Sequence, residues 1–193
     1  MANEIRSLCV YCGSSDGYVA SHAAAAHALG IYLANNRINL VYGGTAIGLM
    51  GAIANAVLSN GGTVTGVTTE HFHAAGITHD GVTQSVITTD MHSRKAEMML
   101  HADAFVALPG GIGTLEEVAE ALTWAQIGHH SKPVGFLNVD GFYNPLIQML
   151  DQMVASGFYR QEQRDALVIA ETPADLLKQL RVATWPDVTK WVK

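Results

Sequence analysis

The stretch at residues 104–126 constrains the fold of this chain more than any other. It consists of a short apolar run (104–108), a glycine-rich loop (109–113) and a helical pattern that begins at Thr114. The apolar run is typical of a buried strand, and the glycines indicate a turn. When a strand leads through glycines into a helix, unpaired N–H groups and the positive end of the helix dipole point at the loop. We therefore expect an α/β fold with a phosphate-binding loop at this place.

Glu117, one turn inside this predicted helix, has two interpretations. Thr114 and Glu117 have the spacing of a capping box, in which Thr114 accepts a hydrogen bond from the N–H of Glu117 and the carboxylate accepts one from the N–H of Thr114. A carboxylate at this position would also reach a sugar attached to a phosphate in the loop. The local pattern is compatible with both roles.

The rest of the chain alternates between strand and helix patterns. We expect strands at 5–11, 38–42, 63–68, 85–88, 104–108, 133–138 and 166–170, and helices at 18–35, 45–59, 91–102, 114–126, 144–156 and 173–181. Only residues 70–83 interrupt this alternation. Continuous apolar strands between helices predict a Rossmann-like three-layer sandwich with a mostly parallel, roughly seven-stranded sheet. We expect one nucleotide-binding domain at residues 1–181 and a C-terminal tail at 182–193.

Composition and charge narrow the classes of partner. No apolar run approaches the ~20 residues that a membrane-spanning helix needs, and residues 1–4 lack a basic targeting segment, so we expect a soluble, cytoplasmic protein. The net charge of −6 argues against binding nucleic acid, because such proteins usually carry a basic face. The expected partner is a small molecule, with no membrane and no nucleic acid involved.

Several common site motifs are absent or incomplete in the sequence. The first predicted turn, at residues 12–17, lacks the Gly-x-Gly-x-x-Gly pattern of dinucleotide-binding dehydrogenases, and no glycine is followed by lysine, which excludes a P-loop. Cys9 and Cys12 lie on one predicted strand, where core packing is their expected role rather than metal binding or redox chemistry. His71, His73 and His79 share one irregular segment, but their spacing is not specific for a metal. We expect no metal site.

Three motifs together resemble those of one known family. They are Val-Tyr-Gly-Gly-Thr-Ala-Ile-Gly-Leu-Met-Gly at 41–51, Asp-Met-His-Ser-Arg-Lys-Ala-Glu-Met at 90–98 and Pro-Gly-Gly-Ile-Gly-Thr-Leu-Glu-Glu at 109–117. In this order and spacing they resemble the LOG ("lonely guy") family over roughly residues 7–180. Its members are cytokinin riboside 5′-monophosphate phosphoribohydrolases, formerly labelled possible lysine decarboxylases.

The resemblance implies a reaction and a set of site residues. The reaction is hydrolysis of the N-glycosidic bond of adenosine 5′-monophosphate or its N6-modified forms, giving the free base and ribose 5-phosphate without a cofactor. The resemblance also implies a homodimer or higher homo-oligomer, and it makes Arg94 a catalytic residue. Glu117 is the second expected catalytic residue, because a carboxylate near the anomeric carbon can stabilise the positive charge that develops on the ribose. The expected substrate-binding residues are Gly13, Ser14, Gly44, Arg94, Lys95, Gly111, Ile112, Gly113, Thr114, Leu115, Glu116, Glu117 and Thr123.

Other interpretations of these motifs stay open at this point. Gly43 and Gly44 either permit a turn or form the wall of the pocket. Arg94 and Lys95 could be a solvated surface pair, although cations at a helix start oppose its dipole, and an anionic ligand would explain their presence. Aligned back from Arg94, the position of a substrate-contacting glutamate in plant relatives falls at Gly76. Alternative functions are a nucleotide-binding sensor or carrier, and a pyridoxal-phosphate-dependent lysine decarboxylase that would use Lys95.

Overall fold

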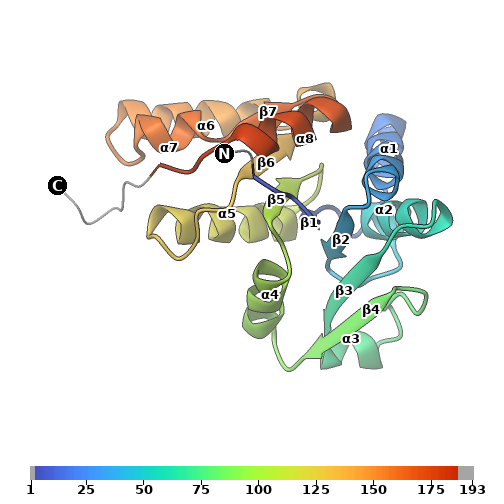
Figure 1. Ribbon diagram of the computed structural model, residues 1–193. Coiled ribbons are helices and arrows are strands. Elements are labelled where there is room, and N and C mark those ends of the chain that lie inside the picture. Colours follow the sequence, from blue (N-terminus) through green and yellow to red (C-terminus); the bar gives the residue numbers. More distant parts are fainter. Residues whose placement is uncertain (1–2, 187–193) are drawn as a thin grey trace.

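A computed structural model describes residues 3–186 of the chain and contains one seven-stranded sheet (Figure 1). The strand order is β4-β3-β2-β1-β5-β6-β7, and all six neighbouring pairs are parallel. The strands are β1 (Ser7–Tyr11), β2 (Asn39–Tyr42), β3 (Val64–Thr69), β4 (Gln84–Thr88), β5 (Ala104–Ala107), β6 (Val134–Leu137) and β7 (Val168–Ala170). The predicted α/β fold with seven strands is confirmed.

Helices cover both faces of the sheet and complete the three layers. One face packs against α1 (Ala20–Asn35), α2 (Gly48–Ser59) and α8 (Pro173–Val182), and the other packs against α4 (Met91–Leu100), α5 (Ile112–Gln126) and α6 (Asn144–Ala155). Three short helical segments lie in connections: α3 (Glu70–Ala74), the 3-10 helix η1 (Val139–Gly141) and α7 (Gln161–Asp165). Because β1 lies between β2 and β5, the strand order reverses at the centre of the sheet, where ligands bind in such folds.

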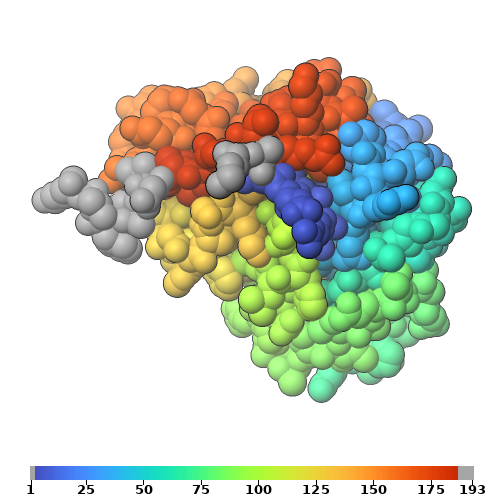
Figure 2. Space-filling model, in the orientation of Figure 1, coloured from blue at the N-terminus to red at the C-terminus, as the bar shows by residue number. Residues whose placement is uncertain are grey.

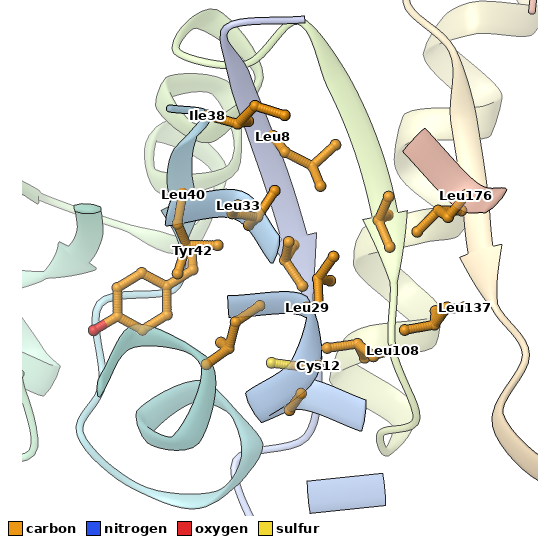
Figure 3. Close-up of a cluster of buried hydrophobic side chains, with 14 of the residues drawn as sticks. Leu8, Cys12, Leu29, Leu33, Ile38, Leu40, Tyr42, Leu108, Leu137 and Leu176 are labelled. Atoms are coloured by element: carbon orange, nitrogen blue, oxygen red, sulfur yellow. The ribbon is translucent and has the colours of Figure 1, made fainter. Parts of the chain in front are cut away.

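Alternate side chains of the central strand enter the two halves of the core. Leu8 and Val10 belong to the cluster under α1, α2 and α8, whereas Cys9 and Tyr11 belong to the cluster under α4 and α5. This alternation follows from the period of two in a strand. Cys12 returns to the first cluster, where Figure 3 shows its sulfur beside Leu29 and Leu108. The expected core role of both cysteines is confirmed, since both are free and buried.

The observed boundaries correct several predicted ones. The first helix starts at Ala20, not Tyr18, and α2 starts at Gly48 rather than directly after the Gly43–Gly44 turn. Ala166, predicted in the last strand, instead ends the unpredicted helix α7. The interrupted segment at 70–83 contains the short helix α3, whose start is capped by the Thr69 hydroxyl. Such ends depend on local hydrogen bonds that an apolar pattern does not encode.

The helix that follows the glycine loop also begins earlier than predicted. It starts at Ile112 with Gly111 as its N-cap, whereas the sequence pattern places the start at Thr114. Thr114 is therefore the third residue inside α5, and it cannot be the N-cap residue of a capping box with Glu117. The capping interpretation of Glu117 is wrong.

The two ends of the described chain lie next to each other. Asn3 donates from its backbone to Arg181 O at 2.6 Å and from its side chain to Leu180 O at 3.1 Å, and Figure 2 shows the first residues against the C-terminal helix. Of the predicted tail, Trp185 packs on the domain and its indole N–H donates to Ala125 O at 3.1 Å, while Trp191 lies outside the described residues. Within residues 3–186, each helix is too short or too polar to cross a membrane.

Candidate active site

A cavity of about 390 Å³ lies at the carboxyl ends of β1, β2 and β5. One part of its wall is polar and comes from the glycine-rich loop, the start of α5 and the start of α4. The other part is apolar and comes from α2 and the residue before it, from α3 and the loop after it, and from Met91 at the start of α4. The lining residues are Cys12, Ser14, Thr45, Ile47, Met50, Phe72, Ile77, Met91, Arg94, Gly111, Ile112, Gly113, Thr114 and Glu117.

The start of α5 presents unpaired N–H groups to this cavity. The first intrahelical bond runs from Leu115 N to Gly111 O at 3.1 Å, so the amides of Ile112, Gly113 and Thr114 precede it and have no intrahelical acceptor. Within the described chain, no side chain caps this helix start. These amides and the helix dipole suit an anion such as a phosphate.

Close packing behind the loop explains one of its glycines. A Cβ atom at Gly110 would lie 2.1 Å from Thr114 Oγ1 and 2.9 Å from Gly13 N, so a larger residue would force the loop away from the first turn of the sheet. Gly13 N also donates to Pro109 O at 3.1 Å. The loops after β1 and β5 therefore support each other at the edge of the cavity.

Arg94 enters the cavity from the start of α4 and is held on three sides. Its side chain is buried and donates from Nε to Val67 O at 2.9 Å, from Nη2 to Gly43 O at 3.1 Å and from Nη1 to Glu117 Oε1 at 3.2 Å. The helix start itself is satisfied by a reciprocal cap between Asp90 and Ser93. The solvated surface interpretation of Arg94 is wrong, because its guanidinium is a fixed part of the site.

Glu117 forms an ion pair with Arg94 in the cavity wall, and only 13% of its side chain is exposed. Burial raises the pKa of Glu117 above its ordinary value, although the charge of Arg94 and its hydrogen bond oppose this shift. The pair places a carboxylate and a guanidinium within one cavity and next to the α5 amides. A sugar phosphate bound at those amides would lie beside the carboxylate.

Lys95 has a different position from the one implied by the resemblance. Its buried ammonium forms ion pairs with Glu116 and with Glu120, the latter at 3.1 Å, and it does not line the cavity. Burial by itself would lower the pKa of Lys95, but the hydrogen bonds and charges of these two carboxylates raise it above its ordinary value. Lys95 is thus neither solvated nor in contact with the cavity.

The other predicted binding residues divide into two groups. Ser14, Gly111, Ile112, Gly113 and Thr114 line the cavity together with Arg94 and Glu117. The second group does not line it and contains Gly13, Gly44, Lys95, Leu115, Glu116 and Thr123. In this group Gly44 packs on Val67, and the Thr123 hydroxyl donates to Ala119 O of its own helix at 2.7 Å.

Gly43 contacts Arg94, although the expected binding residues include only its neighbour Gly44. Its carbonyl accepts from Arg94, and a Cβ atom there would lie 2.1 Å from Arg94 Nη2 and 2.9 Å from Met50 Sδ. Neither Gly43 nor Gly44 lines the cavity, but Gly43 acts on the site indirectly by holding Arg94. The adjacent glycine pair was the available signal, but only the fold shows that Arg94 packs against Gly43.

The apolar wall was also missed, because its members come from separate segments. Phe72 and Ile77 lie in the interrupted segment, which is anchored by Ala46 N to Ile77 O at 3.0 Å and His79 N to Gly44 O at 2.9 Å. The His79 ring forms a hydrogen bond with Asn55 Oδ1 at 3.0 Å.

Across residues 3–186, no three His, Cys, Asp or Glu side chains converge as metal ligands. Gly76 has φ +69° and open space where a side chain would be.

Comparisons with known proteins identify relatives of this chain. A family model described as "Possible lysine decarboxylase" matches residues 50–180. The cytokinin riboside 5′-monophosphate phosphoribohydrolase LOG3 of Arabidopsis thaliana is 47% identical over 178 residues, which are 92% of this chain and 83% of that protein. The phosphoribohydrolase LOG of Oryza sativa subsp. japonica is also 47% identical over 178 residues, 92% of this chain and 74% of that protein.

Solved structures of lower sequence identity share the fold. The molybdenum cofactor carrier protein of Chlamydomonas reinhardtii superposes with a TM-score of 0.69 at 23% identity, over 92% of this chain and 98% of that chain. The structure titled TM1055 has a TM-score of 0.68 at 21% identity, over 90% of this chain and 96% of that chain. At these identities the likeness shows the three-layer architecture alone.

Proposed function

This chain belongs to the LOG family, and from that premise we propose that it hydrolyses the N-glycosidic bond of adenosine 5′-monophosphates, with N6-modified forms as the preferred substrates. The products are a free cytokinin base, or adenine, and ribose 5-phosphate. The observation that carries the proposal is that the buried Arg94–Glu117 pair and the uncapped start of α5 share one cavity.

The phosphate site fixes one end of the substrate. The amides of Ile112, Gly113 and Thr114 bind the 5′-phosphate at the start of α5, as helix N-termini bind anions elsewhere. Because Glu117 lies two turns from the N-cap on the same helix, the attached ribose reaches its carboxylate. Binding at the phosphate thus positions the anomeric carbon near the Arg94–Glu117 pair.

Glu117 and Arg94 then act on the reacting atoms. The bond from C1′ to the base nitrogen breaks with its electron pair leaving on the base, while a water oxygen forms a new bond to C1′. The Glu117 carboxylate stabilises the positive charge on the ribose and accepts the proton of the water. Arg94 orients the ribose and the carboxylate. The departing base takes up a proton from solvent, and Glu117 then releases to solvent the proton that it accepted from the attacking water.

The apolar wall supports a modified base. The cavity wall also contains the apolar side chains of Ile47, Met50, Phe72, Ile77 and Met91. A hydrocarbon substituent on the adenine N6 would remove apolar area of its own and of these side chains from water, which stabilises the complex by about 25 cal/mol per Å². Unmodified AMP lacks this contribution.

Two alternative functions have less support. A pyridoxal phosphate enzyme needs a lysine amine for a Schiff base, and the cavity wall formed by the described residues contains no lysine, while Lys95 is held by two carboxylates. These residues do not fit that cofactor. A carrier or sensor would not need the buried carboxylate beside the phosphate loop, and the resemblance to molybdenum cofactor carriers extends to the fold alone.

Turnover tests the proposal directly. Purified protein is incubated with isopentenyl-AMP or AMP, and free base and ribose 5-phosphate are measured by chromatography. We expect equal amounts of base and ribose 5-phosphate, with a higher kcat/KM for isopentenyl-AMP. Binding of both nucleotides without release of base would overturn the hydrolase proposal in favour of a carrier.

The phosphate loop makes a separate prediction about the substrate. Isopentenyladenosine, which lacks the 5′-phosphate, loses its contacts with the α5 amides, so its kcat/KM should be at least about 10²-fold lower than that of isopentenyl-AMP. Initial rates at subsaturating concentrations measure this ratio. Comparable values for nucleoside and nucleotide would contradict the role of the loop.

The protein is also proposed to form a homodimer. Apolar side chains outside the cavity wall remain exposed on the neighbouring helices α4 and α5, with Leu100 at 75% and Leu115 at 40%. Contact with a second copy would remove this area from water.

A further inference from the structure

Lys95 belongs to a cluster of charges between α4 and α5. Its ammonium is buried and forms ion pairs with Glu116 and Glu120, while the preceding residue, Arg94, forms the ion pair with Glu117. Two consecutive cations of α4 therefore contact three carboxylates of α5. Only the Arg94–Glu117 pair lines the cavity.

The spacing of the carboxylates fixes the orientation of α5. Glu116 and Glu120 are four residues apart and lie on the same face of the helix, whereas Glu117 is one residue, or about 100°, further round the axis. A rotation of α5 that moved Glu117 would also pull Glu116 and Glu120 away from Lys95. The same helix begins with the amides of the glycine loop, so the rotation affects both functional parts of the site.

The charges indicate what would happen without Lys95. Arg94 would then be the only cation left in this cluster, beside the three carboxylates of Glu116, Glu117 and Glu120. The Glu120 side chain is only 21% exposed, so the loss of its partner is costly, and the helix can relieve the cost by turning toward water. Such a turn displaces the Glu117 carboxylate from its position beside Arg94.

A direct contact of Lys95 with substrate is the competing role. It would require the ammonium to leave two carboxylates and move into a cavity that it does not line. The phosphate already has the α5 amides as donors. We propose that Lys95 is a positioning residue, whose ion pairs with Glu116 and Glu120 hold α5 in the rotation that places Glu117 and the glycine loop. This inference rests on the proposed hydrolase activity.

The experiment compares Lys95→Met, Glu120→Gln and the double variant by steady-state kinetics with isopentenyl-AMP. A misplaced reactive group lowers kcat, and about 10²-fold is expected for Lys95→Met with little change in KM. Glu120→Gln, which alters a residue outside the cavity, should lower kcat in the same direction. The double variant should be no worse than Lys95→Met, because both substitutions remove the same interaction. Lys95→Arg, which retains the charge, should recover part of kcat.

Hydrogen exchange of the amides in α5 gives a second readout that does not need activity. Lys95→Met should accelerate exchange in the first hydrogen-bonded turns of α5, from Leu115 to Glu120, while the rest of the chain keeps the parent rates. Arg164→Met is the matched control, because it breaks a 2.7 Å ion pair with Asp151 away from the cavity. It should leave kcat and exchange in α5 unchanged.

The possible outcomes separate the two roles. A large rise in KM for Lys95→Met with kcat retained, together with parent kinetics for Glu120→Gln, would show direct substrate binding and overturn the inference. Parent exchange rates in α5 of Lys95→Met would also overturn it. If the parent itself released no base, the hydrolase proposal would fail, but the exchange experiment would still decide whether Lys95 positions α5.

Discussion

At the scale of single residues, the site depends on charges that are placed before any ligand arrives. Arg94 uses its Nε and Nη2 donors on two backbone carbonyls, which leaves Nη1 directed at Glu117. A lysine could not make these three contacts, because its point charge lacks the planar arrangement of donors. The carboxylate of Glu117 is thereby held in one position, and under the proposed mechanism its protonation state controls the reaction.

Glu117→Gln tests this role of the carboxylate. The glutamine retains the size of the side chain but lacks the negative charge that stabilises the ribose, so kcat should fall at least about 10²-fold while nucleotide binding persists. Steady-state kinetics, nucleotide binding and thermal unfolding measure these effects. A folded variant that retains more than about a tenth of the parent kcat would refute the catalytic assignment.

The raised pKa of Glu117 gives the same experiment a pH readout. Burial raises this pKa and the charge of Glu116 raises it further, whereas the charges of Arg94 and Lys95 lower it. Three groups near Glu117 also have a raised pKa, those of Cys9, Tyr11 and Cys12. The active form is the ionised one, so kcat/KM should fall as pH decreases through a value above the ~4.3 of an ordinary glutamate. This acid limb should be absent in Glu117→Gln.

Gly43→Ala tests the packing of the Arg94 guanidinium against Gly43. The new Cβ would lie 2.1 Å from Arg94 Nη2, so the guanidinium must move, and kcat should fall by about 10²-fold. Gly81→Ala is the control, because its Cβ meets only the flexible His79 ring at 3.1 Å and lies outside the cavity. Initial rates of both variants give the two kcat values. A kcat of Gly43→Ala within twofold of the parent value would contradict the role of Gly43 in placing Arg94.

At the scale of elements, the strand, loop and helix from β5 to α5 form one unit that other elements hold in place. Leu108 N donates to Tyr11 O at 2.9 Å, and Leu108 O accepts from the buried Tyr143 hydroxyl at 2.6 Å. The residue before the glycine loop is therefore tied both to β1 and to the segment before α6. This explains how a glycine-rich loop can keep a defined shape without a ligand.

Tyr143→Phe should weaken this support without touching the cavity. It leaves Leu108 O without its side-chain donor, which costs about 1 kcal/mol of stability, and the looser loop should raise KM for isopentenyl-AMP more than it lowers kcat. Thermal unfolding and steady-state kinetics measure the two effects. Tyr32→Phe on α1 offers a control, and a KM equal to that of the parent in Tyr143→Phe would argue against a role for this bond.

At the scale of the whole molecule, the proposed homodimer gives a test by mass. Light scattering at micromolar concentration should yield twice the mass of one chain, and Leu100→Glu, which places a charge on the exposed surface of α4, should dissociate the dimer. Phe158→Glu is the matched control, because Phe158 is 81% exposed but lies after α6. A monomeric parent protein would exclude the dimer.

The sequence by itself determined the class of fold, and it predicted an anion site at the glycine loop. Alternating apolar strands and helices predict a parallel sheet because periodicity reflects burial within each element. The Gly-rich motif indicates an anion site because its chemistry lies in adjacent backbone groups. In each case the information is local, within one element or one junction.

Only the tertiary structure decided how the elements contact each other. Three features join segments that are distant in sequence. They are the ion pairs of Lys95 with Glu116 and Glu120, the packing of Arg94 against Gly43, and the cavity wall formed by Phe72 and Ile77. The cap interpretation of Glu117 failed because α5 begins two residues earlier than its pattern suggests, at a glycine whose position is held by neighbouring loops. Such contacts depend on the relative placement of helices and strands, and side-chain spacing along one element carries no record of it.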